Sequence, residues 1–102
     1  MIVEFSITPL GKGESLSEDV ARVLNLVDKS GLDYRFTPMG TIVEGEWDEI
    51  MELIKRCHHL MLERANRVST WIHIDDRKGV PRDRLRHKVK AVEERLGREL
   101  KK

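Results

Sequence analysis

The sequence contains a single cysteine, Cys57, among its 102 residues. One cysteine excludes an internal disulfide, so nothing points to an oxidising compartment. No apolar run approaches the ~20 residues that a membrane-spanning helix needs. The N-terminal residues also lack the basic and apolar regions of a secretory signal. We therefore expect a cytoplasmic protein with no membrane partner.

An excess of one charge is also missing, because 19 lysine and arginine side chains nearly cancel 18 aspartate and glutamate side chains. Dedicated nucleic-acid binders usually show a clear basic excess, so we expect no nucleic-acid partner. Charged residues nevertheless make up 36% of the chain, above the roughly 25% of average domains. Such enrichment is reported in heat-adapted proteins.

The length and the hydrophobic pattern predict one domain, residues 1–102, with one modest core. Apolar residues recur at helical spacing in three stretches, and apolar and polar residues alternate in several others. The last helix is expected to begin near Pro81, and a capping-box pattern at Ser15 and Glu18 marks the start of the first. The predicted helices cover 16–30, 46–65 and 81–97. The predicted strands cover 2–8, 34–37, 41–44 and 68–75.

The order of these elements predicts an α+β fold of the ferredoxin-like βαββαβ type, with an extra C-terminal helix. The two middle strands form a hairpin around Pro38-Met39-Gly40. Right-handed crossovers around this hairpin place the first two helices on one face of a four-stranded antiparallel sheet. The other face of the sheet is then open.

Strand alternation assigns side chains to the two faces of this sheet. The helix-covered face is expected to hold Val3, Phe5, Ile7, Val68, Ile72 and Ile74. The open face is expected to hold Glu4, Ser6, Thr8, Ser69, Trp71 and His73. The hairpin adds either Arg35, Thr37, Ile42 and Glu44 or the opposite set. We favour Glu44 on the open face, because burying a carboxylate costs more than burying Thr41 and Val43.

The open face has two interpretations. A tryptophan such as Trp71 on a polar face more often anchors a subunit interface than stacks a planar ligand. Strand threonines usually reflect β-propensity, so the hydroxyl groups alone do not identify a site. A solvated or dimerising surface therefore remains as good an interpretation as a binding site.

No catalytic constellation accompanies the remaining polar residues, so we expect no enzyme, no metal and no required cofactor. His58 and His59 are neighbours on a helix and point about 100° apart, and no further ligand completes a metal site. Cys57 lies in an apolar stripe and is expected in the core. The basic residues from Arg82 to Lys90 lack aromatic companions, which favours a solvated helix face over a nucleic-acid site.

Three segments resemble the thiamine-binding protein family, a group of small ferredoxin-like proteins. The segments are EFSITPLG at 4–11, TPMGTIVEG at 37–45 and RVSTWIHIDDR at 67–77. The resemblance implies a protein that binds thiamine or its hydroxymethylpyrimidine moiety without catalysing a reaction. It also implies that single domains associate through their sheets into homodimers or homotetramers.

The resemblance further implies a set of site residues, which the chemistry of an aminopyrimidine helps to interpret. This ring is planar and carries an exocyclic amine beside ring acceptors. Glu44 would accept a hydrogen bond from the amine, and Trp71 would form one wall. The remaining members of the expected site are Ser6, Thr8, Thr37, Met39, Gly40 and Thr41.

Three functional hypotheses follow from the sequence. The first is a soluble binder of thiamine or its pyrimidine precursor that buffers, delivers or senses it. The second is an oligomeric regulatory or scaffolding module without a small-molecule ligand. The third, an RNA-binding domain, is weak, because such sheets usually expose two or three aromatic residues and only Trp71 is expected on the open face.

Overall fold

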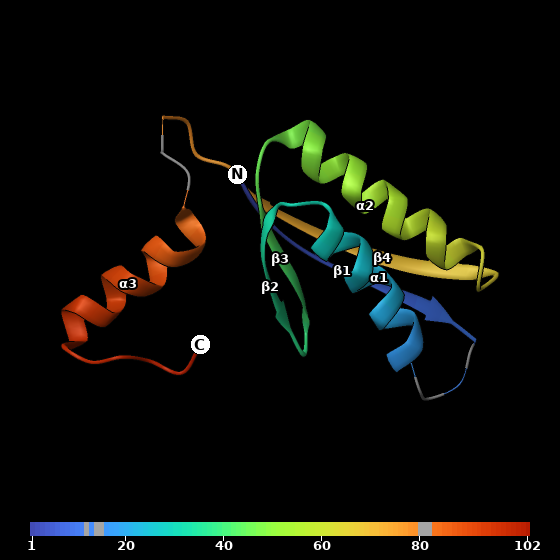
Figure 1. Ribbon diagram of the computed structural model, residues 1–102, viewed down its shortest axis with the longest axis horizontal. Helices are drawn as coiled ribbons and strands as arrows, with labels where there is room; N and C mark the ends of the chain where they lie inside the picture. The colour runs from blue at the N-terminus through green and yellow to red at the C-terminus, as the bar shows by residue number, and fades with distance from the viewer. Residues whose placement is uncertain (12, 14–15, 80–82) are drawn as a thin grey trace.

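The computed structural model describes residues 1–11, 13, 16–79 and 83–102 (Figure 1). Its elements follow the predicted order, and the α+β fold is confirmed. The expected helix-start residues Ser15 and Pro81 lie outside the described residues. The elements are β1 (Ile2–Leu10), α1 (Ser17–Lys29), β2 (Asp33–Thr37), β3 (Gly40–Glu44), α2 (Trp47–Leu62), β4 (Arg67–Asp75) and α3 (Arg84–Leu96).

The four strands form one antiparallel sheet in the order β2-β3-β1-β4. β1 pairs with β4 along its whole length, from Ile2 opposite Asp75 to Leu10 opposite Arg67. Its pairing with β3 is shorter and ends where Phe5 lies opposite Thr41. The second half of β1 therefore has a strand partner on one side only among the described residues.

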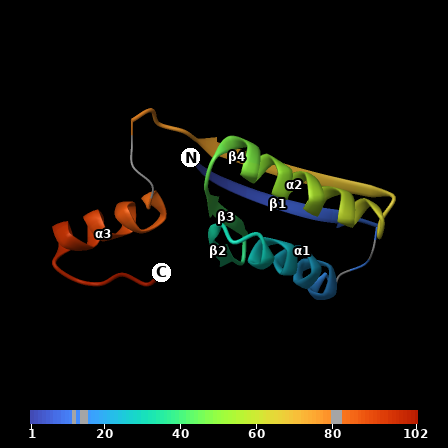
Figure 2. The same cartoon turned by 45° about the horizontal axis from the view of Figure 1, so that its top comes forward.

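The core lies between the sheet and the two helices α1 and α2, which cover the same face (Figure 2). Phe5 from β1, Val27 from α1 and Ile50 from α2 are each at most 2% exposed. Cys57 is buried among them, as predicted, and this burial raises the pKa of its thiol to about 11. Burial of a thiol in apolar surroundings disfavours the thiolate, so this sulfur is poorly reactive.

The strand register confirms the predicted assignment of the two faces. Glu4 lies opposite both Ile42 and His73, and Glu44 lies opposite Ile2, so Glu44 is on the open face as favoured. Thr41 lies opposite Phe5 and belongs to the helix-covered face. Burial is uneven on that face, since Ile72, expected in the core, remains 44% exposed at the sheet's edge.

α3 stands apart from the layers formed by the sheet and the other two helices (Figure 1). None of its residues is buried, although its apolar residues share one stripe. Gly97 ends the helix with a φ of +70°, a left-handed conformation that glycine adopts without strain. None of the described helices is long and apolar enough to span a membrane.

Candidate functional site

A cavity of about 190 Å³ lies between α1, the second half of β1 and the β2–β3 hairpin. Its apolar wall includes Phe5, Val20 and Phe36. Six of the eight residues predicted for the site line it. These are Ser6, Thr8, Thr37, Met39, Gly40 and Thr41.

The cavity exists because β3 ends its pairing with β1 early. At Gly40 the two backbones approach so closely that a Cβ atom would lie 3.0 Å from the Phe5 carbonyl oxygen. Beyond this contact the hairpin turns away, and no described strand pairs with the β3-facing edge of β1 from Ser6 to Leu10. Ser6, Ile7 and Thr8 thus line the cavity with backbone that the β-ladder on this side does not use.

The Thr37 hydroxyl is committed to the hairpin turn. It donates to the Gly40 carbonyl at 2.8 Å and accepts from the backbone N–H groups of Met39 at 3.2 Å and Gly40 at 3.1 Å. Threonine hydroxyls commonly stabilise turns in this way. Thr37 therefore shapes the cavity mouth, and it leaves Met39 85% exposed at the tip of the hairpin.

Trp71 lies beside the cavity rather than in it. It lines a smaller hollow of about 70 Å³ together with Glu4, Ser6 and Met39. Ser6 and Met39 line both hollows, so they are continuous along the sheet surface. Glu4 makes no hydrogen bond or ion pair with any residue that the structure describes, which leaves its carboxylate available.

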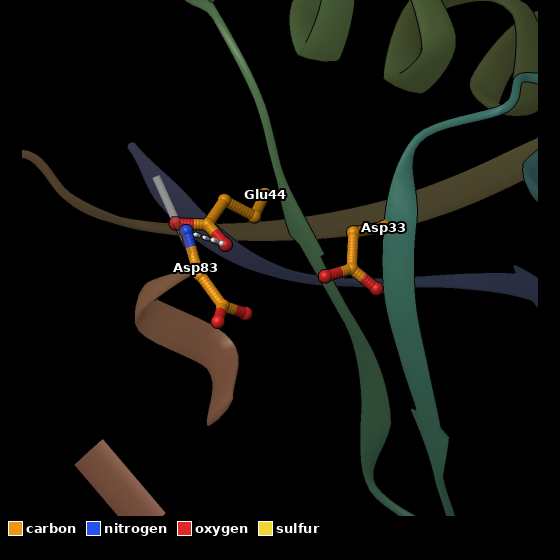
Figure 3. Close-up of side chains that lie close together, drawn as sticks. All are labelled: Asp33, Glu44 and Asp83. Atoms are coloured by element: carbon orange, nitrogen blue, oxygen red, sulfur yellow. Dashed lines mark hydrogen bonds between the residues drawn. The ribbon is translucent and has the colours of Figure 1, made fainter. Parts of the chain in front are cut away.

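Glu44 has a different environment from the one predicted. Its two carboxylate oxygens accept hydrogen bonds from the backbone N–H groups of Asp83, at 3.0 Å, and Arg84, at 2.8 Å (Figure 3). The side chain is 6% exposed and does not line the main cavity. A carboxylate here satisfies donors at the first turn of a helix and favours its dipole, so Glu44 anchors α3 to the sheet.

Asp33, Glu44 and Asp83 bring three carboxylates together at this anchor (Figure 3). Arg86 neutralises two of them, with one guanidinium nitrogen 2.9 Å from Asp83 and 2.6 Å from Asp33. Hydrogen bonds to Asp83 and Asp33 raise the pKa of Arg86 above its ordinary value. The acidic group is thus accounted for by the attachment of α3.

Comparison with known families places this chain. The model of the family described as "Thiamine-binding protein" matches residues 3–93. The chain belongs to that family. Curated members of similar length include a UPF0045 protein of Mycobacterium bovis, 40% identical over 97 residues, which cover 94% of each chain. A UPF0045 protein of Methanocaldococcus jannaschii is 36% identical over 94 residues, covering 92% of this chain and 93% of its own.

Solved structures share the fold. A hypothetical protein from Methanocaldococcus jannaschii, 38% identical, superposes with a TM-score of 0.82 and covers 91% of this chain and 95% of its own. A protein from Thermotoga maritima is 26% identical and superposes with a TM-score of 0.77. It covers 89% of this chain and 96% of its own, and it is named for a proposed role in thiamine biosynthesis or salvage.

Two features of this thiamine-binding family member were absent from the sequence-based site. The first is Glu4, which strand alternation had already placed on the open face beside Ser6, so the signal was present but received no role. The second is the unpaired backbone of β1, which follows from the length mismatch between β1 and β3. That mismatch is detectable in the sequence, because the hairpin strands are short.

Proposed function

We propose that this protein binds thiamine or its hydroxymethylpyrimidine moiety, without catalysing a reaction and without a required cofactor. The main observation is the cavity between α1, β1 and the hairpin, where backbone without a strand partner and hydroxyl groups line an otherwise apolar hollow. Membership of the family and the thiamine-related name of the Thermotoga maritima neighbour support a thiamine-related role.

The chemistry of the cavity suits a small planar heterocycle. An aminopyrimidine presents a donor beside ring acceptors, so the backbone of β1 from Ser6 to Thr8 can bind its edge as a strand would. Phe5 and Phe36 supply apolar walls for its faces. The volume of about 190 Å³ is smaller than the ~300–1,000 Å³ of pockets for drug-sized ligands. The pyrimidine ring therefore enters, and the rest of thiamine extends towards Met39.

Two carboxylates compete for the exocyclic amine in this proposal. Glu44 was predicted from the sequence, but its oxygens already accept two hydrogen bonds from α3. Glu4 lines the neighbouring hollow with Trp71 and has no partner among the described residues. Substituting each carboxylate with glutamine distinguishes them, because the amide places a donor against the amine and should cost about 1–3 kcal/mol of affinity at the true contact.

The experiment is a thermal scan with thiamine and with hydroxymethylpyrimidine. A ligand at about 100 times its dissociation constant adds roughly 2.7 kcal/mol of stability. For a domain of this size, each kcal/mol raises the melting temperature by about 4–8 °C. Thr41→Val removes a cavity hydroxyl at nearly constant volume and should reduce the shift, whereas Thr70→Val, outside the cavity, is the control. An unchanged melting curve with both ligands at millimolar concentration would refute the proposal.

The second candidate is an oligomeric regulatory or scaffolding module with no ligand, and Trp71 favours it. This side chain is 76% exposed on the open face, as an interface anchor in an isolated chain would be. We propose that copies of the chain associate through these faces in the cytoplasm, in either functional case. Light scattering with and without ligand separates the candidates, since only the first predicts a ligand-induced thermal shift.

A further inference from the structure

The two edges of the sheet differ in how well they are protected. β4 forms one edge and is nine residues long, and no described segment pairs with its outer side. Figure 2 shows β4 at the rim of the sheet, with α3 well away from its middle. A strand edge of this length presents a row of unpaired backbone donors and acceptors, which another strand can use.

β4 lacks the residues that usually block such pairing. Natural edges carry lysine, proline or inward-pointing charge, or are very short. Between Arg67 and Asp75, β4 has no proline and no lysine, arginine, aspartate or glutamate. β2, at the opposite edge, has only five residues, carries Asp33 and Arg35, and is followed at once by Pro38. The sheet is therefore guarded at one edge and unguarded at the other.

Two large apolar side chains lie exposed on β4, one on each face of the sheet. Trp71 is 76% exposed on the open face, and Ile72 is 44% exposed although it belongs to the helix-covered face. Covering the open face alone would bury Trp71 and leave Ile72 in water. A strand added along the outer side of β4 would shield both side chains at once.

We propose that β4 pairs antiparallel with β4 of a second copy, about a two-fold axis at Trp71. Residues equally distant from this axis lie opposite each other. Arg67 then faces Asp75 of the second copy, Thr70 faces Ile72, and Trp71 faces its own counterpart. The two sheets become one eight-stranded sheet with α1 and α2 of both copies on the same face, and two Trp71 side chains lie together beside Ser6.

The sequence of β4 selects this register over its neighbours. An axis at Thr70 would place Arg67 opposite His73 of the second copy, and an axis at Ile72 would place it opposite Arg77. Only the axis at Trp71 pairs all nine residues and puts opposite charges at both ends. Asp75 already binds Arg84 and Lys88, so backbone pairing and apolar contact contribute more than this exposed ion pair.

Disulfide trapping tests the edge and its register. Opposing residues in an antiparallel pair have Cβ atoms about 4.5–5.5 Å apart, close enough for a disulfide, whereas diagonal neighbours are about 7–8 Å apart. Mixing Thr70→Cys and Ile72→Cys proteins under mild oxidation should give a covalent dimer, and each variant alone should give little. Both side chains lie on the helix-covered face, so association through the open faces cannot produce this result. The wild-type chain is the control, because Cys57 is buried.

A second measurement covers failure of the trapped variants to associate. The wild-type mass in light scattering should be an even multiple of the 11.9 kDa chain. Trp71→Lys places two ammonium groups at the axis and should return the protein to half that mass or less. Trp47→Lys, which replaces the other exposed tryptophan on α2, should leave the mass unchanged. A monomeric wild type, or equal cross-linking of mixed and single cysteine variants, would overturn the proposal whether or not the protein binds a ligand.

Discussion

α2 and α3 are both amphipathic helices, but the protein holds them by different forces. α2 buries Ile50, Leu53, Ile54, Cys57 and Met61 against the sheet. α3 buries none of its residues, and its described attachments are hydrogen bonds to Glu44 and ion pairs to Asp33 and Asp75. Apolar burial is insensitive to salt and to mild changes of pH, whereas ion pairs are not. α3 is therefore the part of the molecule whose position solution conditions can change.

The largest expected effect comes from opening the core beneath α2. Ile50 is fully buried, so Ile50→Ala loses apolar contacts and leaves a cavity. The free energy of unfolding should fall by about 2–5 kcal/mol. Denaturant titration measures this change. Val92→Ala on the exposed side of α3 is the matched control and should cost little, because Val92 is 47% exposed. Equal losses would mean that α3 is packed as tightly as α2.

Breaking the anchor of α3 should have a smaller and local effect. Glu44→Gln removes the charge and replaces one acceptor with a donor facing the N–H groups of Asp83 and Arg84. The lost interaction is worth about 1–3 kcal/mol. Amide hydrogen exchange should become faster throughout α3 and stay unchanged in α2. Uniformly faster exchange in both helices would show that α3 and the core unfold as one unit.

Acid should loosen α3 before the core. Hydrogen bonds from Lys88 and Arg84 lower the pKa of Asp75 below its ordinary value. A lowered folded-state pKa stabilises the folded state above the ordinary aspartate pKa of about 3.9, and this contribution disappears as the pH falls through the folded-state value. Exchange in α3 should therefore rise between about pH 5 and pH 2. Asp75→Asn should raise it already at pH 7 and remove this pH dependence.

Salt should produce the smallest effect. Arg86 is 53% exposed and bridges Asp33 and Asp83, so Arg86→Ala should cost at most about 1 kcal/mol in the attachment of α3. High salt should weaken α3 in the wild type and have less effect in this variant. Arg95→Ala removes an arginine from the same helix without breaking a described ion pair. A salt response lost equally in both variants would contradict the role of Arg86.

The sequence was sufficient for the fold and for much of the site. Alternation predicted the faces of β1 and β4 because a period of two leaves little choice once one face is buried. The hairpin residues from Thr37 to Thr41 were expected in the site, and they do line the cavity. Their shared location follows from local turn chemistry, which short-range patterns capture.

The contacts of α3 were not predictable in the same way. Periodicity predicted the helix but not the segment that its first turn contacts, because the contact joins Glu44 to Arg84 across much of the chain. A carboxylate on a strand satisfies an exposed or an anchoring role equally well. Only the tertiary placement of α3 decides between them.

The sheet order also has a consequence for synthesis of the chain. β1 lies between β3 and β4, although both of its neighbours follow it in the sequence. Closing such distant pairs slows folding, because the entropy of a long loop is lost before the contacts form. A nascent chain that has not yet reached Arg67 leaves the β4-facing edge of β1 unpaired. Ribosome-bound intermediates of this length should therefore be the species most prone to aggregate and most dependent on chaperones.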